Sequence, residues 1–173
     1  FDLRDIKKLD RCLKKYKPNY IFHLAAQAIV SKSYSDPIDT FSTNVISTLN
    51  LLECLKGIKH NCVVVIITSD KSYRNIEISK GYKEDDFLGG KDPYSGSKAA
   101  VENIIYSYFH SFLKNNKKLK LGIARAGNVI GGGDWSKDRL IPDVMKSFSS
   151  KKKLVIKNPK STRPWLHVFE VLS

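Results

Sequence analysis

Hydrophobic and polar positions in the first third of the chain follow a helical period, interrupted by one short apolar run. An amphipathic pattern at residues 5–17 ends at Pro18 and predicts a helix. The apolar run at 20–26 predicts a strand, and a second, longer amphipathic segment at 38–56 predicts another helix. This part of the chain is therefore expected to fold as helix, strand, helix.

The middle of the chain continues the alternation. A continuous β-branched run at 63–68 is typical of a parallel strand covered on both faces. After a polar loop at 69–91, the pattern predicts a helix at 93–115 and a strand at 119–124. Strands that alternate with helices in this way predict an α/β fold with a doubly wound parallel sheet and right-handed crossovers, an architecture that commonly binds nucleotides.

The pattern changes after residue 127. A glycine-rich loop is followed by a short helix expected at 141–149 and a short strand expected at 154–156. We therefore expect two domains, a partial doubly wound domain at 1–127 and the start of a smaller lobe at 128–173.

Composition argues against a membrane protein, a disulfide-bonded protein and a zinc protein. Of 173 residues, 42% are hydrophobic, which suffices for a globular core. No stretch reaches the roughly 18 to 20 apolar residues that span a bilayer, and the start lacks signal-peptide features, so we expect no membrane partner and a cytoplasmic location. Three cysteines without paired spacing argue against disulfides and zinc, and no metal is expected.

A net charge of +13 is high enough to consider nucleic-acid binding, because clustered lysines bind phosphate groups whatever the base sequence. The lysines occur in short runs spread along the chain and are not interleaved with aromatic residues. This favours a solvated surface, with no nucleic-acid partner, although a basic lining for an anionic substrate fits equally well. A nucleic-acid-binding module and an inactive scaffold are kept as alternatives of a different class.

Groups suited to proton transfer follow the strand expected at 63–68. In such sheets ligands bind beyond the carboxyl ends of the strands, where Ser69, Asp70 and Lys71 lie. The next helix places Tyr94 and Lys98 one turn apart on the same face. A nearby ammonium lowers the pKa of a tyrosine from about 10, so Tyr94 is a candidate base. An ordinary surface pair is the alternative, and Ser69 at the preceding strand end favours the catalytic interpretation.

These residues resemble the serine, tyrosine and lysine of the extended short-chain dehydrogenase/reductase family. The resemblance implies a Rossmann-like NAD-binding domain at 1–127, a nucleotide-sugar-binding lobe at 128–173, and NAD as cofactor. The Leu24-Ala25-Ala26 segment resembles the family's strand-end motif beside the cofactor. The residues implied in cofactor binding are Asp2, Leu3, Leu24, Ala25, Ala26, Asn44, Tyr94 and Lys98.

The residues after Ser69 indicate the branch of the family. Asp70-Lys71, together with segments 127–135, 138–143 and 163–168, resembles the branch that dehydrates CDP-glucose. The resemblance implies a lyase that converts CDP-glucose to CDP-4-keto-6-deoxyglucose through internal redox chemistry, in deoxysugar biosynthesis. Another nucleotide-sugar 4,6-dehydratase, or a 4-epimerase of the same family, is the alternative.

The resemblance also implies a role for each catalytic residue. Tyr94 takes the proton of the sugar O4, and Ser69 binds the same oxygen. Lys71, as a neutral amine, removes the C5 proton, and protonated Asp70 donates to the departing C6 hydroxyl. Lys71 then needs a lowered pKa and Asp70 a raised pKa, and an ordinary ion pair between them shifts both in the wrong direction.

Four further residues are expected to bind substrate. Arg139 and Arg163 are candidates for the diphosphate, because a guanidinium grips phosphate oxygens at two points. Asn128 and Gln27 are candidates for polar contacts to the substrate. Surface ion pairs for the arginines and a structural turn for Asn128 are the alternatives.

The glycine-rich loop that cradles a pyrophosphate in this family is not found in the sequence. We therefore expect the chain to be a fragment, truncated at both ends and inactive alone. By resemblance, the full-length enzyme is expected to form a homodimer through the helices at 38–56 and 93–115.

Overall fold

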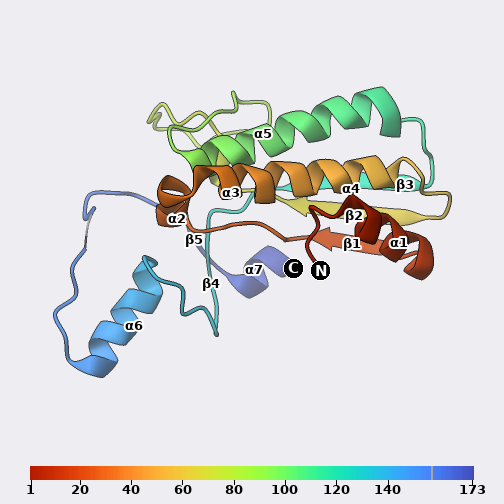
Figure 1. The fold of residues 1–173 in the computed structure, drawn as a ribbon. Helices are drawn as coiled ribbons and strands as arrows, with labels where there is room; N and C mark the ends of the chain where they lie inside the picture. Colours follow the sequence, from red (N-terminus) through yellow and green to blue (C-terminus); the bar gives the residue numbers. More distant parts are fainter. Residues whose placement is uncertain (157) are drawn as a thin grey trace. The chain divides into compact units, whose positions relative to one another are not determined.

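The computed structural model describes residues 1–156 and 158–173 (Figure 1). The chain divides into two compact units, Phe1–Arg125 and Ala126–Ser173, which are described separately. The functional identity of the two domains expected at 1–127 and 128–173 stays a prediction.

The first unit is built on a parallel sheet of three strands in the order β1-β2-β3 (Figure 1). The strands are β1 (Tyr20–His23), β2 (Cys62–Ile67) and β3 (Leu119–Ala124). Tyr20 pairs with Val63 and Cys62 pairs with Leu119, so all three strands end at the same edge. The predicted α/β fold with a parallel sheet is confirmed.

Helices connect the strands, and most of them were expected from periodicity. The predicted helix at 5–17 is α1, and the one at 38–56 is a continuous helical run with a π-helical turn in the middle. The short α2 was not predicted. The helical elements of this unit are α1 (Ile6–Tyr16), α2 (Val30–Ser35), α3 (Pro37–Phe41), η1 (Ser42–Ile46), α4 (Ser47–Leu55), η2 (Asp70–Ser72), α5 (Pro93–Tyr108) and η3 (Phe109–Leu113).

Two helices begin at an Asp-Pro pair. The Asp36 side chain accepts a hydrogen bond from the Asp39 amide, and the Asp92 side chain accepts one from the Ser95 amide. A proline at the first helical position has its φ preset and lacks the N–H that the helix start leaves unpaired. The start of α5, and with it the place of Tyr94, is therefore determined locally.

The core of this unit lies between the sheet and one layer of helices. Val64 and Ile66 of β2 are buried, whereas the alternate residues Val63, Val65 and Ile67 are half-buried. The expectation of cover on both faces is thus not met within the described residues. The reason is that two right-handed crossovers that advance in the same direction place both connecting helices on the same face.

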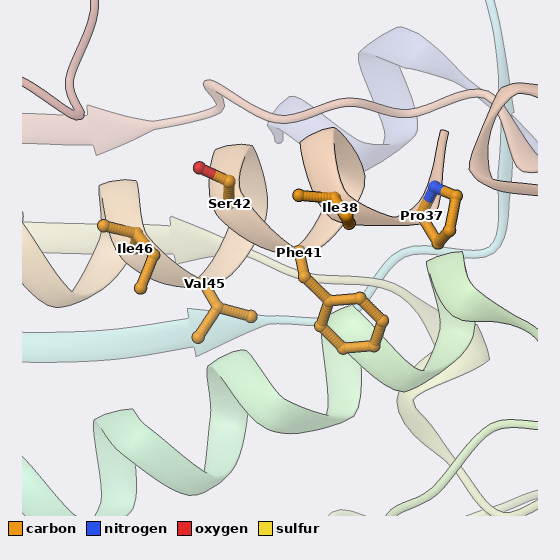
Figure 2. Close-up of a pocket in the computed structure, with 6 residues that line it drawn as sticks. All are labelled: Pro37, Ile38, Phe41, Ser42, Val45 and Ile46. Carbon is orange, nitrogen blue, oxygen red and sulfur yellow. The ribbon is translucent and has the colours of Figure 1, made fainter. Parts of the chain in front are cut away.

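An apolar hollow of about 430 Å³ lies on the outer side of α3 and η1 (Figure 2). Ile38 is 82% exposed, and Phe41 and Ile46 beside it are also exposed. The residues that line the hollow are Pro37, Ile38, Phe41, Ser42, Val45 and Ile46.

The second unit contains β4 (Asn128–Ile130), α6 (Leu140–Ser150), β5 (Trp165–His167) and α7 (Val168–Leu172). β4 and β5 pair in parallel, with Asn128 opposite Trp165. The predicted helix at 141–149 is α6. The strand predicted at 154–156 is wrong, because these residues are irregular and the ladder of this unit forms between β4 and β5 instead.

In the described part of the chain, no helix combines the length and the apolar character that crossing a membrane requires.

Candidate active site

Ser69, Tyr94 and Lys98 are all buried in the first unit. Ser69 follows the end of β2 and starts η2, while Tyr94 and Lys98 belong to the first turns of α5. Because α5 packs against η2, the structure brings the three residues to the carboxyl edge of the sheet. This is the edge at which parallel α/β sheets bind their ligands.

The Lys98 ammonium lies between the strand end and the Tyr94 ring. Its Nζ donates to the backbone oxygen of Ile67 at 3.4 Å and lies 6.0 Å from the centroid of the tyrosine ring. Burial lowers the pKa of Lys98, and the carboxylate of Glu102 opposes that shift. A cation held at this position stabilises a phenolate at Tyr94.

Ser69 also organises the two residues that follow it. Its hydroxyl donates to Asp70 Oδ1 at 3.1 Å and accepts from the Lys71 amide at 3.2 Å. Between Asp70 and Lys71, both half-buried and both described, there is no ion pair. The arrangement that would have opposed the expected acid and base roles is therefore not formed.

Asn44 and Gln27 are held inside the protein by one another. Asn44 Oδ1 accepts from the backbone N–H of Gln27 at 2.7 Å, and Asn44 Nδ2 donates to Ser97 Oγ at 2.8 Å. Ser97 in turn donates to the backbone oxygen of Tyr94 at 2.7 Å. Asn44 is 1% exposed, so this geometry makes it a link between the segment after β1 and the helix that carries Tyr94. Contact of Asn44 with a cofactor and of Gln27 with a substrate stay predictions.

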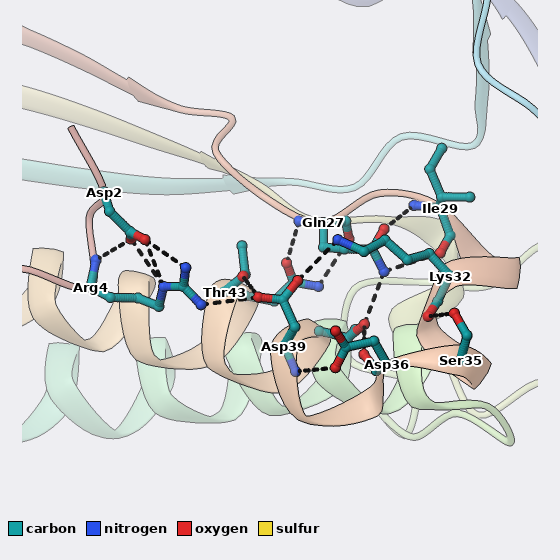
Figure 3. A network of polar contacts seen from close by, with 11 residues as sticks. Asp2, Arg4, Gln27, Ile29, Lys32, Ser35, Asp36, Asp39 and Thr43 are labelled. Carbon is teal, nitrogen blue, oxygen red and sulfur yellow. Dashed lines mark hydrogen bonds and ion pairs between the residues drawn. The ribbon is translucent and has the colours of Figure 1, made fainter.

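The segment that begins the chain is tied to α3 by charged side chains (Figure 3). Arg4 bonds to Asp2 at 2.6 Å and to Asp39 at 3.0 Å, and Lys32 reaches Asp39 at 3.0 Å from the other side. Hydrogen bonds from Arg4 lower the pKa of Asp2 to about 2. Leu3 beside it is half-buried against the core. The contact of Asp2 and Leu3 with an adenine ring stays a prediction.

The end of β1 is open. Leu24 is 64% exposed, Ala25 is exposed and Ala26 is half-buried. Small side chains beyond the carboxyl end of a parallel strand leave room for a ligand to approach the backbone, so these residues fit the dinucleotide cofactor that the resemblance implies.

The remaining substrate candidates belong to the second unit. Asn128 starts β4, and its backbone N–H donates to the backbone oxygen of Pro164 at 3.1 Å. Arg139 precedes α6 and pairs with Asp134 at 3.6 Å, and Arg163 donates to the Thr162 carbonyl at 2.7 Å. Asn128 at the start of β4 lies opposite Trp165, and Arg163 precedes β5 by two residues. Their roles in diphosphate binding stay predictions.

A buried charged pair that the sequence pattern did not predict lies near Ser69, Tyr94 and Lys98. Glu102 accepts hydrogen bonds from Thr68 and from Arg125, the residue after β3. Its spacing of four residues from Lys98 places Glu102 on the helical face that carries Lys98. A carboxylate at that spacing was a signal that could have been found.

Among the described residues, no group of three or more His, Cys, Asp or Glu side chains is arranged to hold a metal ion. The expectation of a metal-free site stays a prediction.

Comparison with known proteins places the chain in a family. The family described as GDP-mannose 4,6 dehydratase matches residues 1–173. The chain belongs to this family. The resemblance to nucleotide-sugar dehydratases and epimerases of the extended short-chain dehydrogenase/reductase type is confirmed.

Curated relatives include two dehydratases. CDP-glucose 4,6-dehydratase of Salmonella typhimurium is 49% identical over 176 residues, which cover 99% of this chain and 49% of that protein. dTDP-D-glucose 4,6-dehydratase of Dictyostelium discoideum is 29% identical and matches 99% of this chain and 41% of its own length. The chain therefore spans about half of the length of the curated relatives that it matches.

Solved structures of the same kind resemble this fold. A double mutant of DesIV, a dTDP-glucose 4,6-dehydratase from Streptomyces venezuelae with NAD and DAU bound, superposes with a TM-score of 0.84 at 26% identity. The match covers 96% of this chain and 49% of that one. UDP-glucose 4-epimerase from Thermotoga maritima, with a TM-score of 0.85 at 21% identity, shows the same fold over 99% of this chain and 55% of its own.

Proposed function

We propose that the protein to which this chain belongs is an NAD-dependent CDP-glucose 4,6-dehydratase. The observation that carries the proposal is the 49% identity to such an enzyme over 99% of the chain. The joint position of the Ser69-Asp70-Lys71 segment with Tyr94 and Lys98 at the carboxyl edge of the sheet supports it.

NAD is proposed as the cofactor because dehydratases of similar fold are described with NAD bound. When bound, NAD accepts the C4 hydride of the sugar and returns it at C6. On the protein side, Leu24, Ala25 and Ala26 leave the strand end accessible, and the buried Lys98 keeps a cation beside the tyrosine.

In the proposed reaction Tyr94, Lys71 and Asp70 each move one proton, and Ser69 binds the substrate. Tyr94, as phenolate, takes the proton from the sugar O4, and Ser69 binds that oxygen. Once a 4-keto group is present, the C5 proton is acidic, and Lys71 as a neutral amine removes it. Asp70 in its protonated form donates a proton to the departing C6 hydroxyl, so that water leaves. General acid–base steps of this kind contribute about 10²- to 10⁴-fold each.

The decisive assay uses the complete protein with NAD and either CDP-glucose or dTDP-glucose. The proposal expects a 4-keto-6-deoxy product from CDP-glucose and not from dTDP-glucose. Turnover of dTDP-glucose alone would favour the related dehydratase, which the 29% identical relative represents. Formation of a C4 epimer, or the absence of turnover with both sugars, would contradict the proposal.

The role of Lys71 has its own test. Lys71→Ala is expected to leave C4 oxidation intact and to abolish water loss, so that NADH accumulates on the enzyme and solvent deuterium no longer enters at C5. Lys91→Ala, an exposed lysine on the loop before α5, is the matched control. Unimpaired dehydration by Lys71→Ala would remove Lys71 from the mechanism.

We also propose that the complete enzyme is a homodimer whose contact includes the apolar hollow of α3 and η1 (Figure 2). Phe112 of η3, within the helix predicted at 93–115, is also an exposed apolar side chain. An exposed apolar face of this kind is typical of an interface. Ile38→Lys is expected to convert the dimer into a monomer in sedimentation analysis, whereas Ile76→Lys on an exposed loop is expected to leave it unchanged. A dimer that survives Ile38→Lys would contradict this interface.

A cytoplasmic location stays a prediction.

A further inference from the structure

Glu102 on α5 and Arg125 after β3 form an ion pair beneath the reactive segment. The Glu102 side chain is 2% exposed and that of Arg125 is 15% exposed. Arg125 Nε lies 2.9 and 2.8 Å from the two carboxylate oxygens, and Nη2 donates to Oε2 as well. Buried ion pairs lose much of their attraction to desolvation, and apolar replacements are often as stable. Stability alone therefore does not account for this pair.

Glu102 holds the residue that leads into the reactive segment. The Thr68 hydroxyl donates to Glu102 Oε1 at 2.7 Å, and the Thr68 amide donates to the Ala124 carbonyl at 2.9 Å. Thr68 immediately precedes Ser69. The carboxylate thus fixes the position of Thr68, the residue that lies between the end of β2 and Ser69.

Arg125 holds the chain on the other side of the same segment. Its guanidinium lies 4.6 Å over the Tyr73 ring, and Tyr73 stacks on Tyr82 with 5.0 Å between centroids. Arg125 Nη1 also donates to the Glu84 carbonyl at 3.0 Å. The Tyr73 amide donates to the Asp70 carbonyl at 3.3 Å, which closes the turn that contains Lys71.

We propose that Glu102 and Arg125 are positioning residues that clamp both ends of the Ser69–Lys71 segment, Glu102 through Thr68 and Arg125 through Tyr73. Because Glu102 follows Lys98 by four residues on the same helical face, the clamp also sets this segment against the helix of Tyr94. The inference rests on the proposed function, since it requires Ser69 and Lys71 to act on the substrate.

The test is the double variant Glu102→Leu/Arg125→Met in the complete protein. Apolar groups of similar size replace both charges, so the midpoint of denaturant unfolding is expected to stay close to that of the wild type. The clamp predicts that kcat falls by about 10²-fold, a loss that a misplacement of about 1 Å can cause, while KM for CDP-glucose changes little. Tyr108→Phe, which removes the bond to Glu53 at the far end of α5, is the control and should retain kcat.

A second pair of variants decides the question if the double variant does not fold. Thr68→Val removes the hydroxyl at nearly constant volume, and Thr68→Ser keeps it. The clamp predicts a lower kcat for Thr68→Val and a kcat near the wild-type value for Thr68→Ser. Equal kcat values for the two would overturn the inference.

The outcomes separate the inference from the proposed function. A wild-type enzyme that forms no product from CDP-glucose contradicts the proposed function. An active wild type, together with a folded double variant of unchanged kcat, overturns the clamp and leaves the proposed function intact.

Discussion

The two units of the chain hold their polar side chains in different ways. In Phe1–Arg125, buried groups bond across distant elements, as Asn44 does with Ser97 and Glu102 with Arg125. In Ala126–Ser173, the arginines bond to near neighbours, Arg139 to Asp134 and Arg163 to Thr162. Of the described residues, the buried side chains belong to the first unit except for that of Pro142 in α6. The core of the first unit thus preorganises the candidate catalytic residues, whereas the two candidate diphosphate-binding arginines of the second unit bond to neighbours in sequence.

The largest effect expected from this contrast is that of Tyr94→Phe in the complete enzyme. Without the hydroxyl that exchanges the O4 proton, kcat is expected to fall by about 10³-fold. Tyr106→Phe, on the exposed side of the same helix, is the control and should retain kcat. Steady-state kinetics with CDP-glucose measures both. A Tyr94→Phe enzyme of nearly normal kcat would show that the preorganised residue is not catalytic.

The second prediction concerns stability. Leu52 is fully buried, so Leu52→Ala is expected to lower the free energy of unfolding by about 2 to 5 kcal/mol through lost contacts and a cavity. Val155→Ala, at a side chain that is 77% exposed in the second unit, is expected to cost less than about 0.5 kcal/mol. Urea denaturation of the complete protein measures the free energy of unfolding of both variants. Comparable decreases for the two would contradict the difference in burial between the units.

The third prediction concerns pH and His23. Burial, with the Lys98 charge as the smaller cause, lowers the pKa of His23 to about 4 from its ordinary 6.5. The unfolded chain therefore binds this proton first, so the contribution of His23 is fully present above pH 6.5 and is lost as the pH falls towards 4. The loss amounts to about 3 kcal/mol by pH 4.

His23→Gln, which keeps a polar group near Thr48, is expected to flatten this part of the stability profile. His110→Gln, at an exposed histidine, serves as the control. Thermal unfolding followed from pH 7 to pH 4 provides the measurement, and parallel profiles for His23→Gln and the wild type would contradict a buried neutral imidazole.

The smallest effect is expected in the second unit. Arg163→Lys keeps the charge but loses the two-point grip on a diphosphate, so KM for CDP-glucose should rise by about tenfold with little change in kcat. Lys160→Arg on the same segment is the control. A fall in kcat at constant KM would mean that this unit takes part in catalysis as well as in binding.

Much of the architecture was predictable because it is encoded locally. Apart from the short helices α2 and η2, the order of helices and strands in residues 1–124 follows from periodicity, and Asp92-Pro93 marks the start of the helix that carries Tyr94. The prediction of a strand at 154–156 was wrong because strand formation there is not decided locally. An apolar β-branched triplet is compatible with a strand, but a strand forms only where a partner completes its ladder, and here β5 takes that place beside β4.

The sequence by itself determined the parallel α/β fold, the family, and the placement of Tyr94 one turn before Lys98. Only the tertiary structure decided that Glu102 bonds to Arg125, 23 residues away, and that Asn44 bonds to Ser97, 53 residues away. The physical reason lies in what each pattern reports. Periodicity records which side of an element is buried, whereas the partner of a buried polar group depends on which elements meet across the core.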